Sequence, residues 1–243
     1  MENKIKPFGV FILIEGPDTA GKSTQTQLLK EKLEEEGKTV ELLHFPDYNS
    51  SFGKMIQEYL KGQLSDSTFE QFLAVQMVYI ADQLAAQEKI QDLIQSGTWV
   101  IADRYDLSTL AYTSARLDLD SSVLIETFNG LLKKGILKHI AQMQDVLLKP
   151  DVTFILDLPY EEIKKRKQEL DGFESNDRFM EEVAKAYTLL ATNPLGQERA
   201  IIKLDATQTI EELHKEILNH AKQFDRIYTA LRTICEREGI ECN

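Results

Sequence analysis

The sequence has little of several features that mark particular classes of protein. Its two cysteines, Cys235 and Cys242, lie near the C-terminus without the spacing of a metal site, so we expect them to be reduced and incidental. No apolar run approaches the roughly 20 residues that cross a bilayer, and no signal peptide is recognisable before the first apolar segment. These features favour a cytoplasmic protein with no membrane partner.

An excess of basic residues is also missing. The chain has 28 Lys and Arg against 40 Asp and Glu, a net charge of −12, whereas proteins that bind nucleic acid need a basic surface. We therefore expect no nucleic-acid partner. Small anionic ligands stay open, because a few local cations and backbone N–H groups can hold a phosphate.

Short apolar runs alternate along the chain with long amphipathic stretches. The β-branched, almost continuously apolar runs are typical of strands buried on both faces of a parallel sheet. We predict strands at 10–15, 39–44, 98–102, 152–157 and 200–204. The helical patterns cover 22–36, 52–62, 67–96, 106–117, 121–134, 159–170, 177–192 and 209–221. This alternation predicts an α/β fold in which helices flank a five-stranded parallel sheet as a three-layer sandwich, in a single domain over residues 1–243.

Two segments depart from this alternation. The polar stretch 164–178, KKRKQELDGFESNDR, is either a solvated helix end or a mobile lid that carries cations to a phosphate. A helical extension at about 222–243 repeats apolar residues at helical spacing. We expect that stripe to pack on the body of the protein.

The stretch GPDTAGKST follows the first predicted strand and opens a predicted helix, which is the context that a phosphate loop requires. Gly16 and Gly21 allow successive N–H groups to form an anion site at the positive end of the helix. Lys22 suits the β- and γ-phosphates of ATP, and the Ser23 hydroxyl suits Mg²⁺. The simpler alternative is a glycine-rich turn that only caps a helix. The predicted ATP-binding residues of the loop are Gly16, Pro17, Asp18, Thr19, Ala20, Gly21, Lys22, Ser23 and Thr24.

The third predicted strand ends in the letters ADRY. This places Asp103 and Arg104 at the carboxyl edge of a central strand. An acid there can hold Mg²⁺ through water, and the forked guanidinium of an adjacent arginine suits a second phosphate. The alternative is a buried structural ion pair.

Together these motifs resemble the thymidylate kinases, phosphate-loop enzymes that phosphorylate dTMP, over about residues 8–220. The resemblance rests on IEGPDTAGKSTQ at 14–25, HFPDY at 44–48, TWVIADRYDLSTLAY at 98–112, LKPDVTFILDL at 148–158, DRFMEE at 177–182 and LDATQTIEELHKEI at 204–217. It implies a phosphate-loop NTPase fold with a short lid, the Mg²⁺-dependent reaction ATP + dTMP → ADP + dTDP, and a homodimer for which helix 67–96 is a candidate surface.

The resemblance also implies roles for individual residues. Asp18 would contact the deoxyribose 3′-hydroxyl, and Arg104 would clamp the dTMP phosphate. Lid cations, with Arg166 and Arg178 among them, would reach the transferring phosphoryl group. The remaining expected contacts are Tyr79, Gln83 and Ser108 at the base, Tyr112 on the 2′ side of the sugar, Phe45 and Pro46 in the loop that lines the acceptor pocket, and Asp205 and Ala206 beside adenine.

Three positions depart from the pattern of the family. Thr19 stands where many relatives have an arginine, Tyr48 where some relatives have a phosphate-binding arginine, and Gln83 where an arginine commonly contacts thymine. A glutamine amide can accept from thymine N3–H and donate to O4, but uracil and guanine present the same order of donor and acceptor. A related nucleotide or nucleoside kinase with another base preference, and an ATP-binding regulatory protein without turnover, are therefore the alternative functions.

Overall fold

The computed structural model describes residues 9–64, 66, 68–119, 126–170, 177–192 and 200–238. Within them, one sheet has the strand order β2-β3-β1-β4-β5, and every neighbouring pair is parallel. Its strands are β1 (Phe11–Glu15), β2 (Val40–His44), β3 (Trp99–Asp103), β4 (Val152–Asp157) and β5 (Ile201–Asp205). The predicted five-stranded parallel sheet is confirmed, and each strand lies within one residue of its expected bounds.

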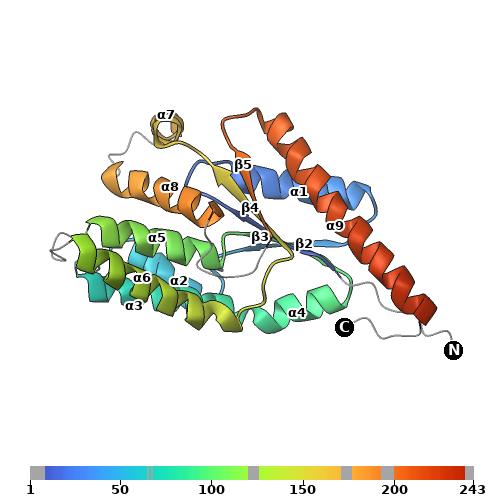
Figure 1. The fold of residues 1–243 in the computed structure, drawn as a ribbon, viewed down its shortest axis with the longest axis horizontal. Helices are drawn as coiled ribbons and strands as arrows, with labels where there is room; N and C mark the ends of the chain where they lie inside the picture. Colours follow the sequence, from blue (N-terminus) through green and yellow to red (C-terminus); the bar gives the residue numbers. More distant parts are fainter. Residues whose placement is uncertain are drawn as a thin grey trace.

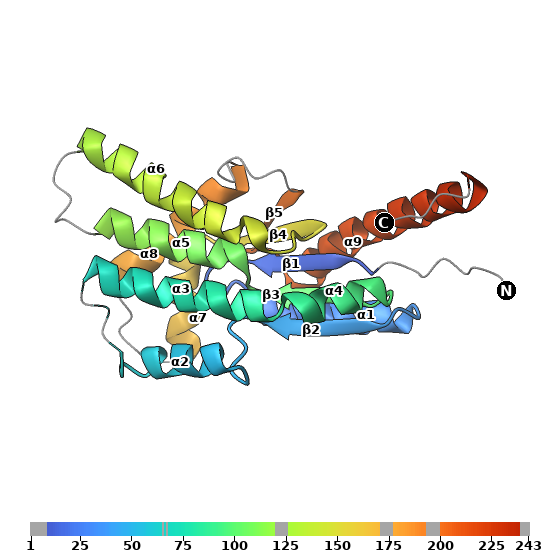
Figure 2. The same cartoon turned by 90° about the horizontal axis from the view of Figure 1, so that it is seen from below.

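Helices cover both faces of this sheet, so the three layers are also confirmed (Figure 1). Helices α1 and α9 lie on one face, whereas α3, α4, α5 and α6 lie on the other (Figures 1 and 2). The helices are α1 (Lys22–Glu35), α2 (Ser51–Leu60), α3 (Phe69–Ala85), α4 (Gln87–Gln95), α5 (Asp106–Leu119), α6 (Glu126–Met143), α7 (Tyr160–Leu170), α8 (Asp177–Thr192) and α9 (Ile210–Glu238), with a 3-10 turn η1 (Gln144–Val146).

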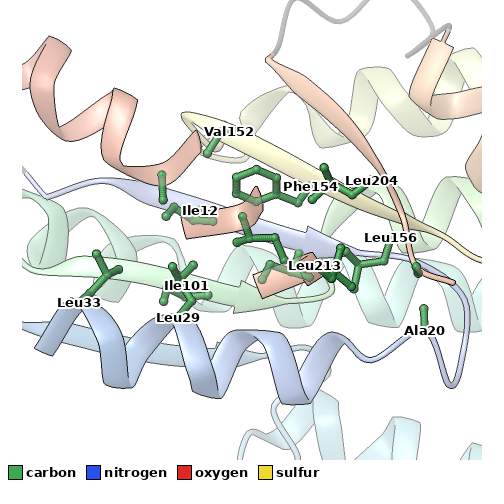
Figure 3. Packing of buried hydrophobic residues seen from close by; sticks show 14 of the residues in the cluster. Ile12, Ala20, Leu29, Leu33, Ile101, Val152, Phe154, Leu156, Leu204 and Leu213 are labelled. Carbon is green, nitrogen blue, oxygen red and sulfur yellow. The ribbon is translucent and has the colours of Figure 1, made fainter. Parts of the chain in front are cut away.

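Alternate residues of the central strand β1 serve the two faces of the sheet. Ile12 and Ile14 belong to the hydrophobic cluster that includes Leu29 of α1 and Leu213 of α9 (Figure 3). Phe11 and Leu13 belong to a second cluster that includes Ile90 of α4. Burial of each such side chain stabilises the fold by about 1.5–3 kcal/mol. The phosphate loop therefore follows a strand that is fixed from both sides.

The expectation of one helix over 67–96 is wrong, because α3 ends at Ala85 and α4 begins at Gln87. The Ala86 N–H donates to the Gln83 carbonyl three residues earlier, at 3.3 Å. The Gln87 side-chain amide donates to the same carbonyl at 2.7 Å, and its Oε1 accepts from the Leu148 N–H. These side-chain bonds compete with the helical pattern, and they turn the chain so that α4 packs under the sheet.

Two further helices extend beyond their predicted ends. Helix α6 continues past 134 to Met143, because Leu137 and Ile140 pack into a cluster shared with α5 and α8; the start predicted at 121 lies outside the described residues. Helix α9 does not stop at 221 but runs without a break to Glu238, beyond the edge of the sheet (Figure 2).

The apolar stripe of the C-terminal extension packs only at its beginning. Phe224 and Tyr228 contact the core, and the Tyr228 hydroxyl donates to Asp151. Ile227 and Ile234 are 52% and 53% exposed. The expectation that the stripe packs on the body therefore holds for the first turns after residue 222 and is wrong for these two residues. In the described part of the chain, no helix has the length and apolar character needed to cross a membrane.

Candidate active site

The phosphate loop, residues 16–24, joins β1 to α1. Gly16 has φ +147°, and a Cβ there would lie 2.7 Å from the Leu156 carbonyl oxygen. Gly21 has φ +92° and is the N-cap of α1, where no side chain caps the helix. The first N–H groups of α1 are thus left for an anion, and the helix dipole favours negative charge at that end.

Lys22 lies in the first turn of α1 and is only 7% exposed. Its Nζ donates to the Pro17 carbonyl at 2.8 Å, which holds the ammonium over the loop. Burial lowers the pKa of Lys22 to about 8, and the charge of Arg104 acts in the same direction, whereas Asp18 and Asp103 oppose the shift. A polyphosphate bound in the loop would stabilise the protonated form.

Ser23 and Asp103 are adjacent, since the Ser23 hydroxyl donates to Asp103 Oδ2 at 2.7 Å. Burial raises the pKa of Asp103, but hydrogen bonds from His44 and Ser23 and the charge of Lys22 lower it by more, so the net shift is downward. Asp103 Oδ1 is buried and has no hydrogen-bond partner among the described residues. A hydroxyl beside an ionised carboxylate with a spare oxygen fits Mg²⁺, which takes most of its other ligands from phosphate and water.

A cavity of about 590 Å³, the phosphate-loop cavity, lies over this loop. Six of the predicted loop residues line it, and Gly16, Pro17 and Ala20 do not. The other lining residues come from the ends of β2 and β3, from the loop after β2 and from α7. The full lining is Asp18, Thr19, Gly21, Lys22, Ser23, Thr24, His44, Tyr48, Asp103, Arg104 and Arg166.

Arg166 is the lid cation that the structure brings to this cavity. It lies on α7, and its guanidinium donates to the Thr19 carbonyl at 3.1 Å and to the Ala206 carbonyl at 2.7 Å. It therefore bridges the phosphate loop and the turn after β5.

The other lid cations lie differently. Lys165 pairs with Glu162, and the charge of Lys167 contributes to lowering the pKa of Asp18. Arg178 is exposed at the start of α8, and it does not line the phosphate-loop cavity. Residues 171–176 of the proposed lid lie outside the described residues.

A second cavity of about 320 Å³, the aromatic cavity, lies beside the first. Asp18, His44, Tyr48 and Arg104 line both cavities, so the two meet at these residues. Rings dominate the rest of the wall, which suits a planar base. Its lining is Asp18, His44, Phe45, Pro46, Tyr48, Tyr59, Leu60, Phe72, Gln76, Tyr79, Gln83, Arg104, Tyr105, Ser108, Thr109, Tyr112 and Phe179.

The loop after β2 forms one side of the aromatic cavity, and α3 holds it in place. Asp82 of α3 is buried and accepts from the Asp47 N–H at 2.8 Å and from the Ser50 hydroxyl. Phe45 and Pro46, joined by a cis peptide bond, are buried in that loop.

Arg104 stands where the two cavities meet. Its backbone is left-handed, with φ +67°, and its N–H donates to the Ile14 carbonyl at 3.1 Å, which ties the end of β3 to β1. The side chain lies over the Tyr112 ring, at 5.7 Å from the ring centre. Its Nη2 pairs with the Asp18 carboxylate, and partial burial raises the pKa of Asp18, but the charges of Arg104 and Lys22 lower it by more.

Gln83 is 2% exposed and lines the aromatic cavity. Its Nε2 donates to the Tyr105 carbonyl at 3.0 Å, which fixes the orientation of the amide. Its Oε1 is buried and has no partner among the residues described here. Thr109, which was not predicted from the sequence, also lines the cavity. Its Oγ1 is buried and likewise has no hydrogen-bond partner among the described residues.

Several other residues of these cavities were missed by sequence reasoning. Tyr59 and Phe72 come from α2 and α3, and Phe179 comes from α8, without a local motif. Asp205 and Ala206, which were expected beside adenine, do not line either cavity; Asp205 accepts from Thr207, and Ala206 is reached by Arg166. His44, Tyr105 and Thr109 also line the aromatic cavity and did carry a signal, because they stand inside the motifs HFPDY and TWVIADRYDLSTLAY.

Comparisons of the chain with family models, curated proteins and solved structures all point to one family. A family model described as thymidylate kinase matches residues 14–217. A thymidylate kinase of Plasmodium falciparum is 30% identical over 213 residues, which are 88% of this chain and 90% of that protein. A thymidylate kinase of an Exiguobacterium strain is 33% identical over 219 residues, 87% of this chain and 93% of that protein.

A solved structure is also similar. The thymidylate kinase of Candida albicans, which is described as having broad substrate specificity, matches with a TM-score of 0.71 and 28% identity. The match covers 90% of this chain and 93% of that one. This likeness confirms the predicted phosphate-loop NTPase fold.

Proposed function

The chain belongs to the thymidylate kinase family, and from that premise we propose how its two cavities perform the reaction. The protein transfers the γ-phosphoryl group of ATP to dTMP, giving ADP and dTDP. The observation that carries this assignment to the site is that the phosphate-loop cavity and the aromatic cavity share four lining residues. ATP occupies the first, dTMP occupies the second, and the phosphoryl group crosses where they meet.

The phosphate loop holds the donor. Backbone N–H groups at the start of α1 bind the phosphates, and Lys22 neutralises charge on the β- and γ-phosphates. Ser23 and Asp103 are the residues that would hold Mg²⁺, which when bound neutralises charge on the phosphate oxygens.

Arg104 and Asp18 hold the acceptor. The Arg104 guanidinium binds the dTMP phosphate, and to do so its Nη2 exchanges the Asp18 carboxylate for a phosphate oxygen. Asp18 is then released to accept from the 3′-hydroxyl of the sugar. Tyr112, whose pKa burial raises to about 12, stays a neutral phenol and packs beside the sugar.

Arg166 supplies the lid cation. Its guanidinium has five N–H donors, and among the described residues it donates to the carbonyl oxygens of Thr19 in the phosphate loop and of Ala206 after β5. A bound triphosphate offers a stronger, charged acceptor in the same cavity. Arg166 therefore compensates for the threonine at position 19. The same role for Arg178 has no geometric support.

Gln83 and Thr109 read the base. The Gln83 Nε2 donates one of its two hydrogens to the Tyr105 carbonyl, which fixes the amide, and the buried acceptor Oε1 has no partner among the described residues and is open to a ligand. Thymine N3–H is a donor that satisfies it, and the Thr109 hydroxyl can donate to a neighbouring carbonyl of the base. Tyr79, half-buried in the same wall, packs on the ring.

The two alternative functions are not favoured. A nucleoside kinase or an ATP-binding protein without turnover would not be expected to match the thymidylate kinase model and relatives over most of the chain. The homodimer, the cytoplasmic location and the absence of a nucleic-acid partner stay predictions.

An assay of ADP release with dTMP, dUMP, dCMP and dGMP tests the proposed function. We expect turnover with dTMP, weaker turnover with dUMP, which lacks the methyl group, and the weakest turnover with dCMP, whose N3 cannot donate to Gln83. ATP binding without turnover on any of the four nucleotides would contradict the assignment as an enzyme. A preference for dCMP or dGMP would contradict the reading of the base.

A further inference from the structure

Glu15 is a fully buried carboxylate that the mechanism above leaves unused. It is the last residue of β1, directly before the phosphate loop, and it is 0% exposed. A buried carboxylate is costly unless it is hydrogen-bonded. The reason for its presence must therefore lie in what its two oxygens contact.

Four donors point at this carboxylate. Oε1 accepts from the backbone N–H of Tyr105 at 2.8 Å and of Ser108 at 3.1 Å. Oε2 accepts from the hydroxyl of Ser108 at 2.7 Å and from the hydroxyl of Tyr187 at 3.0 Å. Such a set of donors suits a carboxylate anion. It also joins β1, the start of α5 and helix α8, which lie far apart in the sequence.

Both hydroxyls also contact Arg104. Its Nη1 donates to Ser108 Oγ at 3.3 Å and to Tyr187 Oη at 3.3 Å. A hydroxyl has one hydrogen and two lone pairs. When Ser108 and Tyr187 give their hydrogens to Glu15, their lone pairs are left for the guanidinium, which can only donate.

We propose that Glu15 is a positioning residue for Arg104, which it orients through the hydroxyls of Ser108 and Tyr187. This inference rests on the proposed function, since it assigns Arg104 to the acceptor phosphate. The two hydroxyl oxygens also lie 2.8 Å from each other, but the carboxylate can only accept, so it favours the arrangement in which both hydroxyls donate to it and offer lone pairs to Nη1. Nη1 is thereby held from behind, and Nη2 is directed to the junction of the two cavities. Burial raises the pKa of Glu15, and the charge of Arg104 and the hydrogen bonds from Ser108 and Tyr105 oppose the rise.

The decisive variant is Glu15→Gln, which keeps the shape and removes the charge. Its carbonyl must face the two backbone N–H groups, so its NH₂ faces the two hydroxyls. The hydroxyls must then accept from the amide; one of them can donate to the other, but the second hydrogen has lost its acceptor on residue 15 and competes with Arg104, donor against donor. We expect KM for dTMP to rise about tenfold or more, with KM for ATP changed less than about twofold.

Two comparisons separate positioning from general damage. Gln144→Leu removes another buried hydrogen bond, from Nε2 to the Asp106 carbonyl, at a residue that lines neither cavity and does not contact Glu15, and it should lower stability without changing KM for dTMP. In an Arg104→Ala background, Glu15→Gln should add nothing to the loss of dTMP affinity, because Glu15 acts only through Arg104.

Tyr187→Phe keeps the buried charge and removes one of the two hydroxyls, so it serves if Glu15→Gln does not fold. It should raise KM for dTMP by a smaller factor, about threefold. An unchanged KM for dTMP in a folded Glu15→Gln or Tyr187→Phe protein would overturn the inference, as would a full effect of Glu15→Gln in the Arg104→Ala background. If the unaltered protein failed to use dTMP at all, the proposed function itself would be wrong.

Discussion

The phosphate-loop cavity and the aromatic cavity meet at four residues, but they are built in different ways. Six of the residues that line the first come from the short stretch 18–24, which runs from the loop after β1 into the first turn of α1, and the expected phosphate contacts are mainly backbone N–H groups. The second is assembled from side chains of α2, α3, α5, α8 and the loop after β2. A site made by local backbone tolerates change elsewhere in the fold, whereas a site made by distant side chains depends on how the helices pack.

The largest effect is expected from Lys22→Ala, which changes the phosphate-loop cavity. The variant removes the charge that neutralises the transferring phosphoryl group, so kcat should fall about 10²–10³-fold, while KM for dTMP stays nearly constant. Steady-state kinetics measure both. Lys30→Ala is the matched control, because Lys30 lies on the same helix and its ion pair among the described residues is with Glu34 at the surface. Equal losses in both variants would remove the special role of Lys22.

Arg104→Ala removes a side chain that lines both cavities where they meet. Loss of charge-assisted hydrogen bonds to the acceptor phosphate costs about 1.5–3 kcal/mol, so KM for dTMP should rise about 10- to 100-fold. Arg104→Lys keeps the charge without the forked guanidinium, so its KM for dTMP should lie between those of the unaltered protein and Arg104→Ala. A larger rise in KM for ATP than for dTMP would show that Arg104 serves the donor instead.

Gln83→Leu tests base recognition in the aromatic cavity, because it removes Oε1, the acceptor without a partner among the described residues. Thymine N3–H then loses its partner, and kcat/KM for dTMP should fall about tenfold. The unaltered protein should discriminate against N3-methyl-dTMP, and the variant should discriminate much less. Thr113 of α5 is also a buried polar residue, but it lines neither cavity. Thr113→Val should therefore leave kcat/KM for dTMP and for N3-methyl-dTMP unchanged. Undiminished discrimination in Gln83→Leu would assign base recognition to other residues.

A smaller effect is expected from pH, through Lys22. Its pKa is lowered to about 8 by burial, so the free protein loses this charge as the pH rises through that value. Polyphosphate binds the protonated form, so binding takes up a proton and ATP affinity should fall by up to roughly tenfold between pH 7 and pH 9. Calorimetric titration in buffers of different ionisation enthalpy measures the proton uptake. An ATP affinity that stays constant above pH 8, with no proton uptake on binding, would contradict this role of the Lys22 charge.

The sequence alone predicted the sheet and the phosphate loop well, because both are encoded locally. Buried strands appear as short β-branched apolar runs, and the glycines of the loop stand where positive φ values are needed. It was weaker where side chains decide the outcome. The break at Ala86 depends on the Gln87 amide, whose other partners, Leu148 and Tyr105, are distant in the chain.

The anion-binding backbone of this protein's donor site was therefore determined by nine consecutive residues, since a helix start presents its N–H groups wherever such a loop precedes it. The acceptor site, and the placement of Arg166 beside the phosphate loop, were decided only by tertiary structure. Tyr187 and Glu15 are 172 residues apart, and Arg166 and Thr19 are 147 apart, yet each pair is in hydrogen-bond contact. No periodicity or spacing encodes such meetings, because they depend on how α7 and α8 pack against the sheet.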